Sequence, residues 1–162
     1  MEIVLSRVDD RLLHGQVATS WVRTFTPQVI VVVDEKLPDD KVQVQILKVA
    51  APPGTKVYVM KPEKITEKIK AGILNNYKVM FIFAGLTSPK YMIDNGVPIK
   101  TINVGGMRFR EGREQLSKTI SMTPEEKEIA RELLDKGIEL EHRQVVTDNK
   151  LDVSKILAGA SE

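Results

Sequence analysis

Residues 29–60 have the sequence VIVVVDEKLPDDKVQVQILKVAAPPGTKVYVM. Residues 29–33 are all β-branched and apolar, which is typical of a strand that is buried on both faces of a sheet. The next apolar residues share one face of a helix: Val42, Ile46, Val49 and Ala50. Pro52-Pro53-Gly54 ends that helix, and residues 57–60 form a second apolar run. This order predicts a strand, a crossover helix and a second strand parallel to the first.

The same alternation extends over most of the chain. Short apolar runs predict further strands at residues 3–6, 79–84 and 101–104, and helical spacing fills residues 17–25 and 62–73. Such alternation predicts an α/β fold with an open, twisted, mostly parallel sheet and helices on both faces. We expect residues 1–162 to form a single domain, because the chain is too short for two full domains.

The second half of the chain is less regular. Residues 105–114 fit neither period and predict a long loop, a kind of segment that often carries function. Thr123 has the position of a helix N-cap, Pro124 that of the first helical residue and Glu126 that of a capping-box partner. Gly137 ends this helix. A late strand at residues 138–146 and a short helix at 152–157 follow, and one late strand is a candidate for antiparallel pairing.

The composition excludes several classes of protein. The chain has 162 residues, 42% of them hydrophobic, and a formal net charge of +2, so a disordered or supercharged chain is excluded. It has no cysteine, which excludes disulfides, thiol nucleophiles and cysteine-ligated zinc. The longest apolar run, residues 79–84, is too short to span a bilayer, and the first residues lack the pattern of a secretory signal. We therefore expect a soluble chain.

Neither a nucleotide cofactor nor a nucleic acid is expected as a ligand. No Gly-x-Gly-x-x-Gly fingerprint follows a strand, and residues 85–90 lack the Gly-Lys-Ser/Thr ending of a nucleotide-binding loop. The sequence pI is about 8.8, but the charges are nearly balanced and only 5% of residues are aromatic. The sequence thus has no basic stripe or stacking surface for nucleic acid. Its 2 histidines do not make a convincing metal site.

The connection between the first strand and the first helix carries an unusual set of side chains. Asp9 and Asp10 stand between two cations, Arg7 and Arg11, and His14 follows them. In an open parallel sheet this connection lies at the carboxyl edge, where ligands bind. A neutral imidazole is a nucleophile near pH 7 without another base, so it can accept a phosphoryl group directly.

The neighbours of this candidate nucleophile suit a phosphate group. Arg7 and Arg11 can supply charge-assisted hydrogen bonds, and the backbone amides of Gly15 and Gln16, at the start of a helix, can stabilise the added anion. Asp9 can orient the imidazole ring or one of the arginines. Phosphoryl transfer depends mainly on such positioning and electrostatic stabilisation.

Residues 7–21, RVDDRLLHGQVATSW, resemble the active-site signature of the IIB component of mannose/fructose/sorbose-type sugar phosphotransferase systems. The resemblance continues in residues 31–34 and 103–107 and in the late helix that Gly137 ends, so it covers essentially the whole chain. It implies a single IIB domain of α/β fold that acts in sugar transport. The implied activity is that of a protein-N(pi)-phosphohistidine–sugar phosphotransferase, with a phosphoprotein intermediate on His14.

The resemblance also implies a role for each residue of the motif. His14 receives the phosphoryl group on its Nδ1 nitrogen from a phosphohistidine of a IIA protein and passes it to a sugar. Arg11, Arg7 and Asp9 stabilise the transferring group and order the loop, while backbone amides around Gly15 hold the phosphate. Neither a metal ion nor a cofactor is implied.

The partners implied by the resemblance are a phosphorylated IIA protein and the IIC/IID membrane permease that holds the sugar. The chain is then cytoplasmic and makes only peripheral contact with the membrane complex, recruited by the permease to the inner face of the plasma membrane. Because Met1 stands immediately before the first strand, we expect IIA on a separate chain. The sequence does not identify the sugar, because the sugar pocket belongs to the permease. It also leaves open whether the chain forms a homo-oligomer.

Other interpretations stay open from the sequence alone. The His14 loop can be a helix cap with ordinary surface ion pairs. A receiver-like signalling domain also has acidic residues after its first strand. It needs an acceptor aspartate after the third strand and a lysine after the fifth, where this chain has Met60-Lys61 and Val104-Gly105. The basic residues of 105–118 can form a docking edge for phosphorylated IIA or a solvated loop. His142 is expected to be structural or to lie on the surface.

Overall fold

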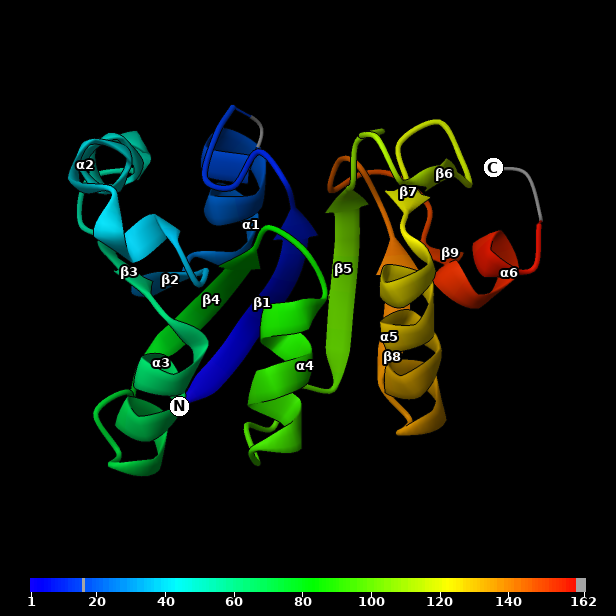
Figure 1. The fold of residues 1–162 in the computed structure, drawn as a ribbon. Helices are drawn as coiled ribbons and strands as arrows, with labels where there is room; N and C mark the ends of the chain where they lie inside the picture. Colours follow the sequence, from blue (N-terminus) through cyan, green and yellow to red (C-terminus); the bar gives the residue numbers. More distant parts are fainter. Residues whose placement is uncertain (16, 160–162) are drawn as a thin grey trace.

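The computed structural model describes residues 1–15 and 17–159, and in these residues seven strands form one sheet (Figure 1). The strands are β1 (Glu2–Asp9), β2 (Val29–Val33), β3 (Lys56–Met60), β4 (Lys78–Phe83), β5 (Thr101–Gly106), β8 (Glu139–His142) and β9 (Leu151–Asp152). Their order is β3-β2-β4-β1-β5-β8-β9, and every pairing is parallel except that of β8 with β9. The predicted open, mostly parallel sheet is confirmed.

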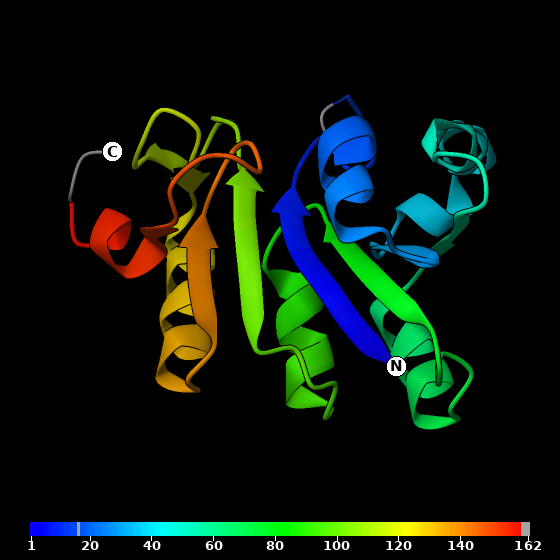
Figure 2. The ribbon, with the colours of Figure 1, turned by 180° about the vertical axis from the view of Figure 1, so that it is seen from behind.

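Helices cover both faces of this sheet (Figures 1 and 2). One face packs against α3 (Pro62–Lys70), α4 (Thr87–Asp94) and α5 (Pro124–Asp135), and the other against α1 (Val22–Phe25) and α2 (Lys41–Ala50). The π-helical turn η1 (Val17–Trp21) leads into α1, the 3-10 turn η2 (Leu37–Asp39) precedes α2, and α6 (Val153–Leu157) packs beside β8 and α5. The predicted two-sided cover is confirmed.

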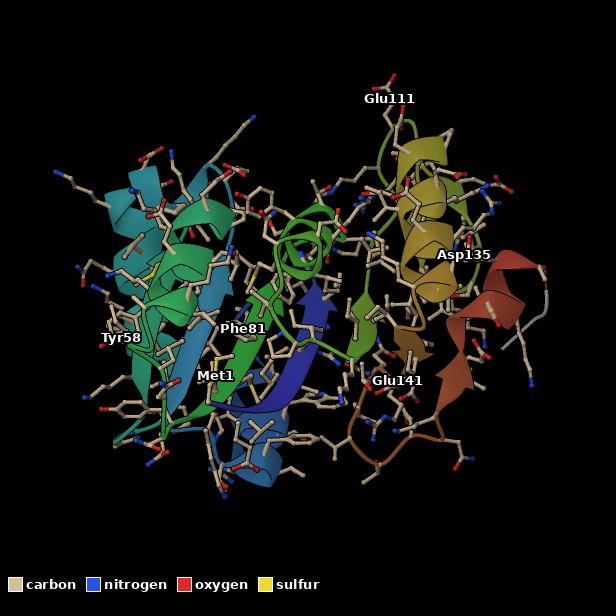
Figure 3. The ribbon with its side chains drawn as sticks, turned by 90° about the horizontal axis from the view of Figure 1, so that it is seen from below. Met1, Tyr58, Phe81, Glu111, Asp135 and Glu141 are labelled. Atoms are coloured by element: carbon tan, nitrogen blue, oxygen red, sulfur yellow. The ribbon has the colours of Figure 1, made fainter. Side chains whose placement is uncertain are left out.

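The core consists of two apolar layers, because successive residues of a strand point to opposite faces. In β2, Val29, Val31 and Val33 belong to one layer, and Ile30 and Val32 to the other. The strand β4 is divided in the same way, and Figure 3 shows the sheet from below with side chains on both of its sides. The long apolar runs of the sequence are therefore strands that are buried on both faces.

The strand order bears on the receiver-like alternative. Receiver-like, flavodoxin-type sheets have the order 2-1-3-4-5, which places the first strand beside the second. Here β1 lies between β4 and β5 instead. The alternative is therefore not supported.

Helix α2 is present as predicted, but the face that it buries is not the predicted one. Of the predicted face, Val42, Ile46 and Val49 are 68%, 54% and 82% exposed, and only Ala50 packs against the core. Leu47 is buried in the core instead, and Val44 is half-buried. This helix carries two apolar stripes and packs beside β3, the edge strand of the sheet, so only one stripe contacts the core.

Helix α3 is shorter than its apolar spacing predicts. It ends at Lys70, and Ile73 is 54% exposed rather than part of the buried face. Gly72 has a φ of 78°, a left-handed conformation that a continuing helix does not allow. The glycine therefore stops the helix before the third isoleucine of the pattern.

The C-terminal strand is also shorter than predicted. The strand β8 is parallel to β5. It ends at His142, because the chain then turns away from the sheet. In that turn the amides of Gln144 and Val145 donate to the Asp148 carboxylate at 3.1 and 2.9 Å. The late antiparallel strand is β9, where the sequence predicts the start of the terminal helix, and Asp152 caps α6 by accepting from the Ser154 amide at 2.8 Å.

The segment after β5 is a loop that contains a second, small sheet. The strands β6 (Glu114–Gln115) and β7 (Ser121–Met122) pair antiparallel, and Met107 forms an isolated bridge with Ile120. No helix within residues 1–15 and 17–159 is both long enough and apolar enough to cross a membrane.

The capping box of α5 is confirmed and supplies a stability prediction. Thr123 Oγ1 accepts from the Glu126 amide at 3.1 Å, and the Glu126 carboxylate accepts from the Thr123 amide at 2.8 Å. We expect Thr123→Ala to lower the free energy of unfolding by about 1 kcal/mol, measured by urea denaturation. Thr87, the first residue of α4, makes no capping bond, so Thr87→Ala should cost less than about 0.5 kcal/mol. Equal losses in the two variants would contradict the assigned cap.

Candidate active site

The predicted reactive connection leaves the sheet at the carboxyl end of β1. There β1 lies beside β5, and the onward connections of the two strands run in opposite directions, from β1 to β2 and from β5 to β8. Open α/β folds bind their ligands at such a switch point. The structure therefore places the His14 connection where this fold usually holds a ligand.

The connection is a tight loop anchored by one buried side chain. Leu13 is 1% exposed, whereas His14 and Gly15 are exposed. Leu12 has a φ of 60°, which is uncommon for a residue other than glycine. The His14 amide donates to the Leu12 carbonyl at 3.0 Å, and the His14 carbonyl accepts from the Val17 amide at 3.1 Å. The loop thus presents the imidazole to solvent.

The imidazole of His14 makes no hydrogen bond with any described residue, so an incoming group can reach the ring. The predicted first helix follows at once, with its first turn, η1, in π-helical form. Such π-helical turns occur frequently at functional sites.

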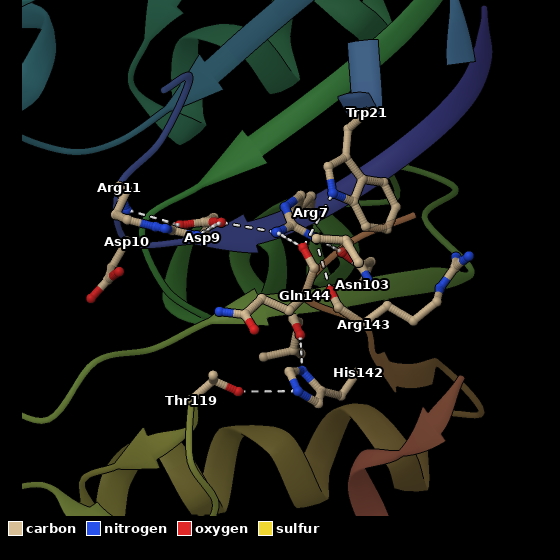
Figure 4. A network of polar contacts seen from close by, with 12 residues as sticks. Arg7, Asp9, Asp10, Arg11, Trp21, Asn103, Thr119, His142, Arg143 and Gln144 are labelled. Carbon is tan, nitrogen blue, oxygen red and sulfur yellow. Dashed lines mark hydrogen bonds and ion pairs between the residues drawn. The ribbon is translucent and has the colours of Figure 1, made fainter. Parts of the chain in front are cut away.

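Beneath this loop, Arg7 and Asp9 form a buried ion pair (Figure 4). Arg7 Nη2 donates to Asp9 Oδ2 at 2.9 Å, and both side chains are almost completely buried. The guanidinium also donates to the Asn103 side chain and to the carbonyls of Arg143 and Gln144, at 3.1 and 3.2 Å for the two carbonyls. Burial lowers the pKa of Arg7, and the charge of Asp9 opposes that shift.

Two further residues shape the space around Arg7. The Trp21 ring lies 4.4 Å from the centre of the guanidinium, in a cation–π contact, and its Nε1 donates to the Gln144 carbonyl at 3.4 Å. On the other side stands Gly105, where an added Cβ would lie 2.0 Å from Arg7 Cζ. The carboxyl end of β5 therefore has room for Arg7 only because residue 105 is glycine.

Asp9 also positions Arg11. Asp9 Oδ1 accepts from the Arg11 backbone amide and from Arg11 Nε, both at 3.1 Å. The hydrogen bond to Asp9 raises the pKa of Arg11, whose side chain is 41% exposed. Asp9 thus connects a buried arginine to one that faces solvent at the edge of the site.

Asp10 holds the loop that follows β5. Its carboxylate accepts from the Arg108 backbone amide at 3.0 Å and from Arg108 Nε at 3.2 Å, and lies 3.5 Å from Arg110 Nη2. The Asp10 side chain is fully covered, whereas those of Arg108 and Arg110 are 63% and 59% exposed. These contacts bring the basic loop against the His14 connection.

The structure brings the described site residues of the sequence prediction together at the end of β1, at two levels. Asp9 is the last residue of β1, and Arg11 and the exposed His14 and Gly15 lie on the connection that follows it at the carboxyl edge. The guanidinium of Arg7 lies beneath them, with its described hydrogen bonds directed to protein acceptors. Gln16, which the sequence assigns to phosphate binding, is outside the described residues.

Sequence reasoning missed the residues that surround Arg7. Asn103 pairs with Arg7 in the parallel register of β1 and β5, and Gly105 provides the space beside it. The only signal was that residues 103–107 belong to the family resemblance. Of the two positions that the sequence left open for His142, the structure has the structural one: it is buried, with Nδ1 2.6 Å from the Val104 carbonyl and Nε2 3.1 Å from Thr119 Oγ1.

Comparison with known proteins gives a consistent result. The family model described as "PTS system sorbose subfamily IIB component" matches residues 3–162. The PTS system fructose-specific EIIB component of Bacillus subtilis is 33% identical over 100% of this chain and 99% of its own length. The mannose-specific EIIAB component of Escherichia coli is 36% identical, over 98% of this chain and 49% of its own length. The crystal structure of the IIBSor domain of the sorbose permease from Klebsiella pneumoniae matches with a TM-score of 0.94 and 35% identity, covering 98% of this chain and 97% of that one.

The close approach of Gly105 to Arg7 supplies a prediction with a neighbouring control. We expect Gly105→Ala to lower the free energy of unfolding by about 3 kcal/mol, because the new methyl group must displace a buried guanidinium from its acceptors. Gly106→Ala should be nearly neutral, since its Cβ would lie 3.9 Å from Asp9 Oδ1, an ordinary contact. Chemical denaturation of both variants measures the difference, and a stable Gly105→Ala variant would disagree with the packing described here.

Proposed function

The chain belongs to the sorbose subfamily of IIB components of the sugar phosphotransferase system, and from this membership we propose that His14 carries a phosphoryl group from a IIA protein to a sugar. IIB components of this system are sugar phosphotransferases in sugar transport and work with IIA and IIC/IID components. The observation that carries the proposal is the exposed imidazole of His14 at the switch point of the sheet.

The transfer consists of two displacements at phosphorus. A ring nitrogen of His14, Nδ1 in our proposal, attacks the phosphorus of a phosphohistidine on IIA. The donor N–P bond breaks, and the donor histidine keeps the electron pair. A sugar hydroxyl then attacks the phosphorus on His14, the second N–P bond breaks, and the hydroxyl proton is released. Both steps need only positioning and compensation of negative charge.

The residues around His14 supply that compensation in our proposal. Arg11 is partly exposed and already oriented by Asp9, so it can donate to a phosphoryl oxygen without first losing a competing protein contact. The backbone amides near Gly15, and that of Gln16, can hold the other oxygens at the start of the helical segment. Asp9 is buried, so it is a positioning residue rather than a group that contacts phosphate.

Arg7 takes a different role from direct phosphate binding in this proposal. Its guanidinium is buried and engaged with Asp9, Asn103 and two backbone carbonyls. We assign it to holding Asp9, and through Asp9 the loop and Arg11. Both terminal nitrogens of this buried charge donate to fixed acceptors, and such contacts hold those acceptors in one arrangement.

The proposed partners are a phosphorylated IIA protein and a IIC/IID permease on the cytoplasmic side of the membrane. The exposed Arg108 and Arg110 lie beside the His14 connection and form a basic edge for docking. Relatives are named for fructose, mannose, sorbose and N-acetylgalactosamine. We propose a sugar of this class without choosing one, because the sugar pocket belongs to the permease.

The proposal predicts which histidine is modified. After incubation with a phosphorylated IIA donor and its upstream phosphotransferase proteins, intact-mass analysis of wild type should show one added, acid-labile phosphoryl group. His14→Gln should gain none, because it lacks the nucleophile. His142→Gln, which removes the buried histidine, should still be modified once its folding has been verified by circular dichroism. Normal phosphorylation of His14→Gln would refute the proposal.

A further inference from the structure

A separate cavity of about 240 Å³ opens beside the His14 connection. It is lined by Asp10 and Arg11, which follow β1, by Arg108 and Phe109 of the loop after β5, and by Lys118 and Gln144. His14 does not line it. The volume is below the range of about 300–1,000 Å³ that is typical of pockets for drug-sized ligands, so the cavity suits a ligand of monosaccharide size.

The charges that line this cavity favour a dianion. Three cations, Arg11, Arg108 and Lys118, face one carboxylate, that of Asp10, which leaves two positive charges. Arg108 uses its backbone amide and Nε for Asp10, and its terminal amino groups make no hydrogen bond with the described residues. Lys118 likewise forms no ion pair within the described chain. A phosphate monoester, with a charge of about −1.5 to −2 at pH 7, matches this balance.

The uncharged lining favours a sugar attached to that phosphate. The Phe109 side chain is 65% exposed and offers a flat apolar face. The backbone carbonyl of Gln144 is held by Arg7 and Trp21, and its side-chain amide points toward the space between Asp10 and Thr119 in Figure 4. An amide that both donates and accepts can pair with sugar hydroxyls, while an aromatic face packs against the apolar face of a sugar ring.

We propose that this cavity binds a hexose phosphate, with the phosphate between Arg108 and Lys118 and the sugar ring against Phe109 and Gln144. The site goes beyond the proposed transfer function, because the ligand is a free ester and binding requires neither His14 nor a phosphorylated donor. Occupancy would place a second dianion beside Arg11, which borders both the cavity and the His14 connection.

Calorimetry and amide NMR of the full chain test the site with three probes: glucose 6-phosphate, inorganic phosphate and glucose. Glucose 6-phosphate should bind saturably and shift the amide signals of Gly106, Phe109 and Lys118. Inorganic phosphate should bind at the same place about tenfold more weakly, since it lacks the sugar contacts. Glucose alone should not bind. An absence of saturable binding by glucose 6-phosphate, or binding of glucose as tight as that of its phosphate, overturns the proposal.

Variants distinguish specific binding in this cavity from a non-specific electrostatic attraction of anions to the chain. Lys118→Gln should weaken binding of both phosphate probes about tenfold, because it removes one charge-assisted contact. Phe109→Ala should abolish the preference for the ester. Lys48→Gln makes the same charge change on α2, away from the cavity, and should bind like wild type. Equal weakening by Lys118→Gln and Lys48→Gln overturns the proposal.

His14→Gln should also bind like wild type, even though it cannot carry phosphate. Retained binding in a variant that fails in transfer, or in a wild-type chain that accepts no phosphoryl group, would show that the cavity is independent of the proposed function. Loss of glucose 6-phosphate binding in a folded His14→Gln variant overturns the claim of a separate site.

Discussion

The ion pair that Arg7 and Asp9 form at the carboxyl end of β1 is the interaction on which the site depends. Burying two charges costs several kcal/mol for each ion unless every polar atom is well matched. Here four acceptors contact the two terminal nitrogens of the guanidinium, the Trp21 ring covers one of its faces, and Gly105 leaves the space for it, while the Arg7 Nε makes no hydrogen bond with the described residues. One buried group thus ties together the ends of β1 and β5, the turn η1 and the turn after β8. The loop that carries His14 begins directly after this buried ion pair.

The two consecutive aspartates position different arginines. Asp9 faces inward, where it joins Arg7 to Arg11, while Asp10 fixes Arg108 and Arg110 of the loop after β5. Exposed guanidinium groups therefore collect at one edge of a chain whose net charge is only +2. Such a positively charged edge attracts a dianionic phosphoryl group, and the carboxylates of Asp9 and Asp10 reduce the repulsion between the arginines that they contact. In our two proposals, Arg11 borders both the phosphoryl site and the cavity for a hexose phosphate.

The sequence predicted the structural features that depend on residues close together in the chain. It missed those that depend on contacts between residues far apart in the chain. The strands, the capping box at Thr123 and the motif around His14 are local patterns, and the structure contains each of them. The burial of Arg7 is different, because Asn103 and Gln144 lie 96 and 137 residues away along the chain. Spacing could not decide which of the two apolar stripes of α2 packs on the core, since the position of the helix at the sheet edge sets that choice. The late strand ends early because the Asp148 carboxylate accepts from the amides of Gln144 and Val145, which then cannot continue the sheet.

The central claim is that Asp9 acts on phosphoryl transfer through Arg11, and a double-mutant cycle on the rate of phosphoryl acceptance from IIA tests it most directly. Arg11→Gln, Asp9→Asn and the double variant are compared under conditions where urea unfolding shows each to be folded. We predict that each single variant is slower by about 10²-fold and that the double variant is no slower than the slower single one, because the two residues act as a unit. Independent, multiplicative losses, or an unchanged rate in either single variant, would contradict the account.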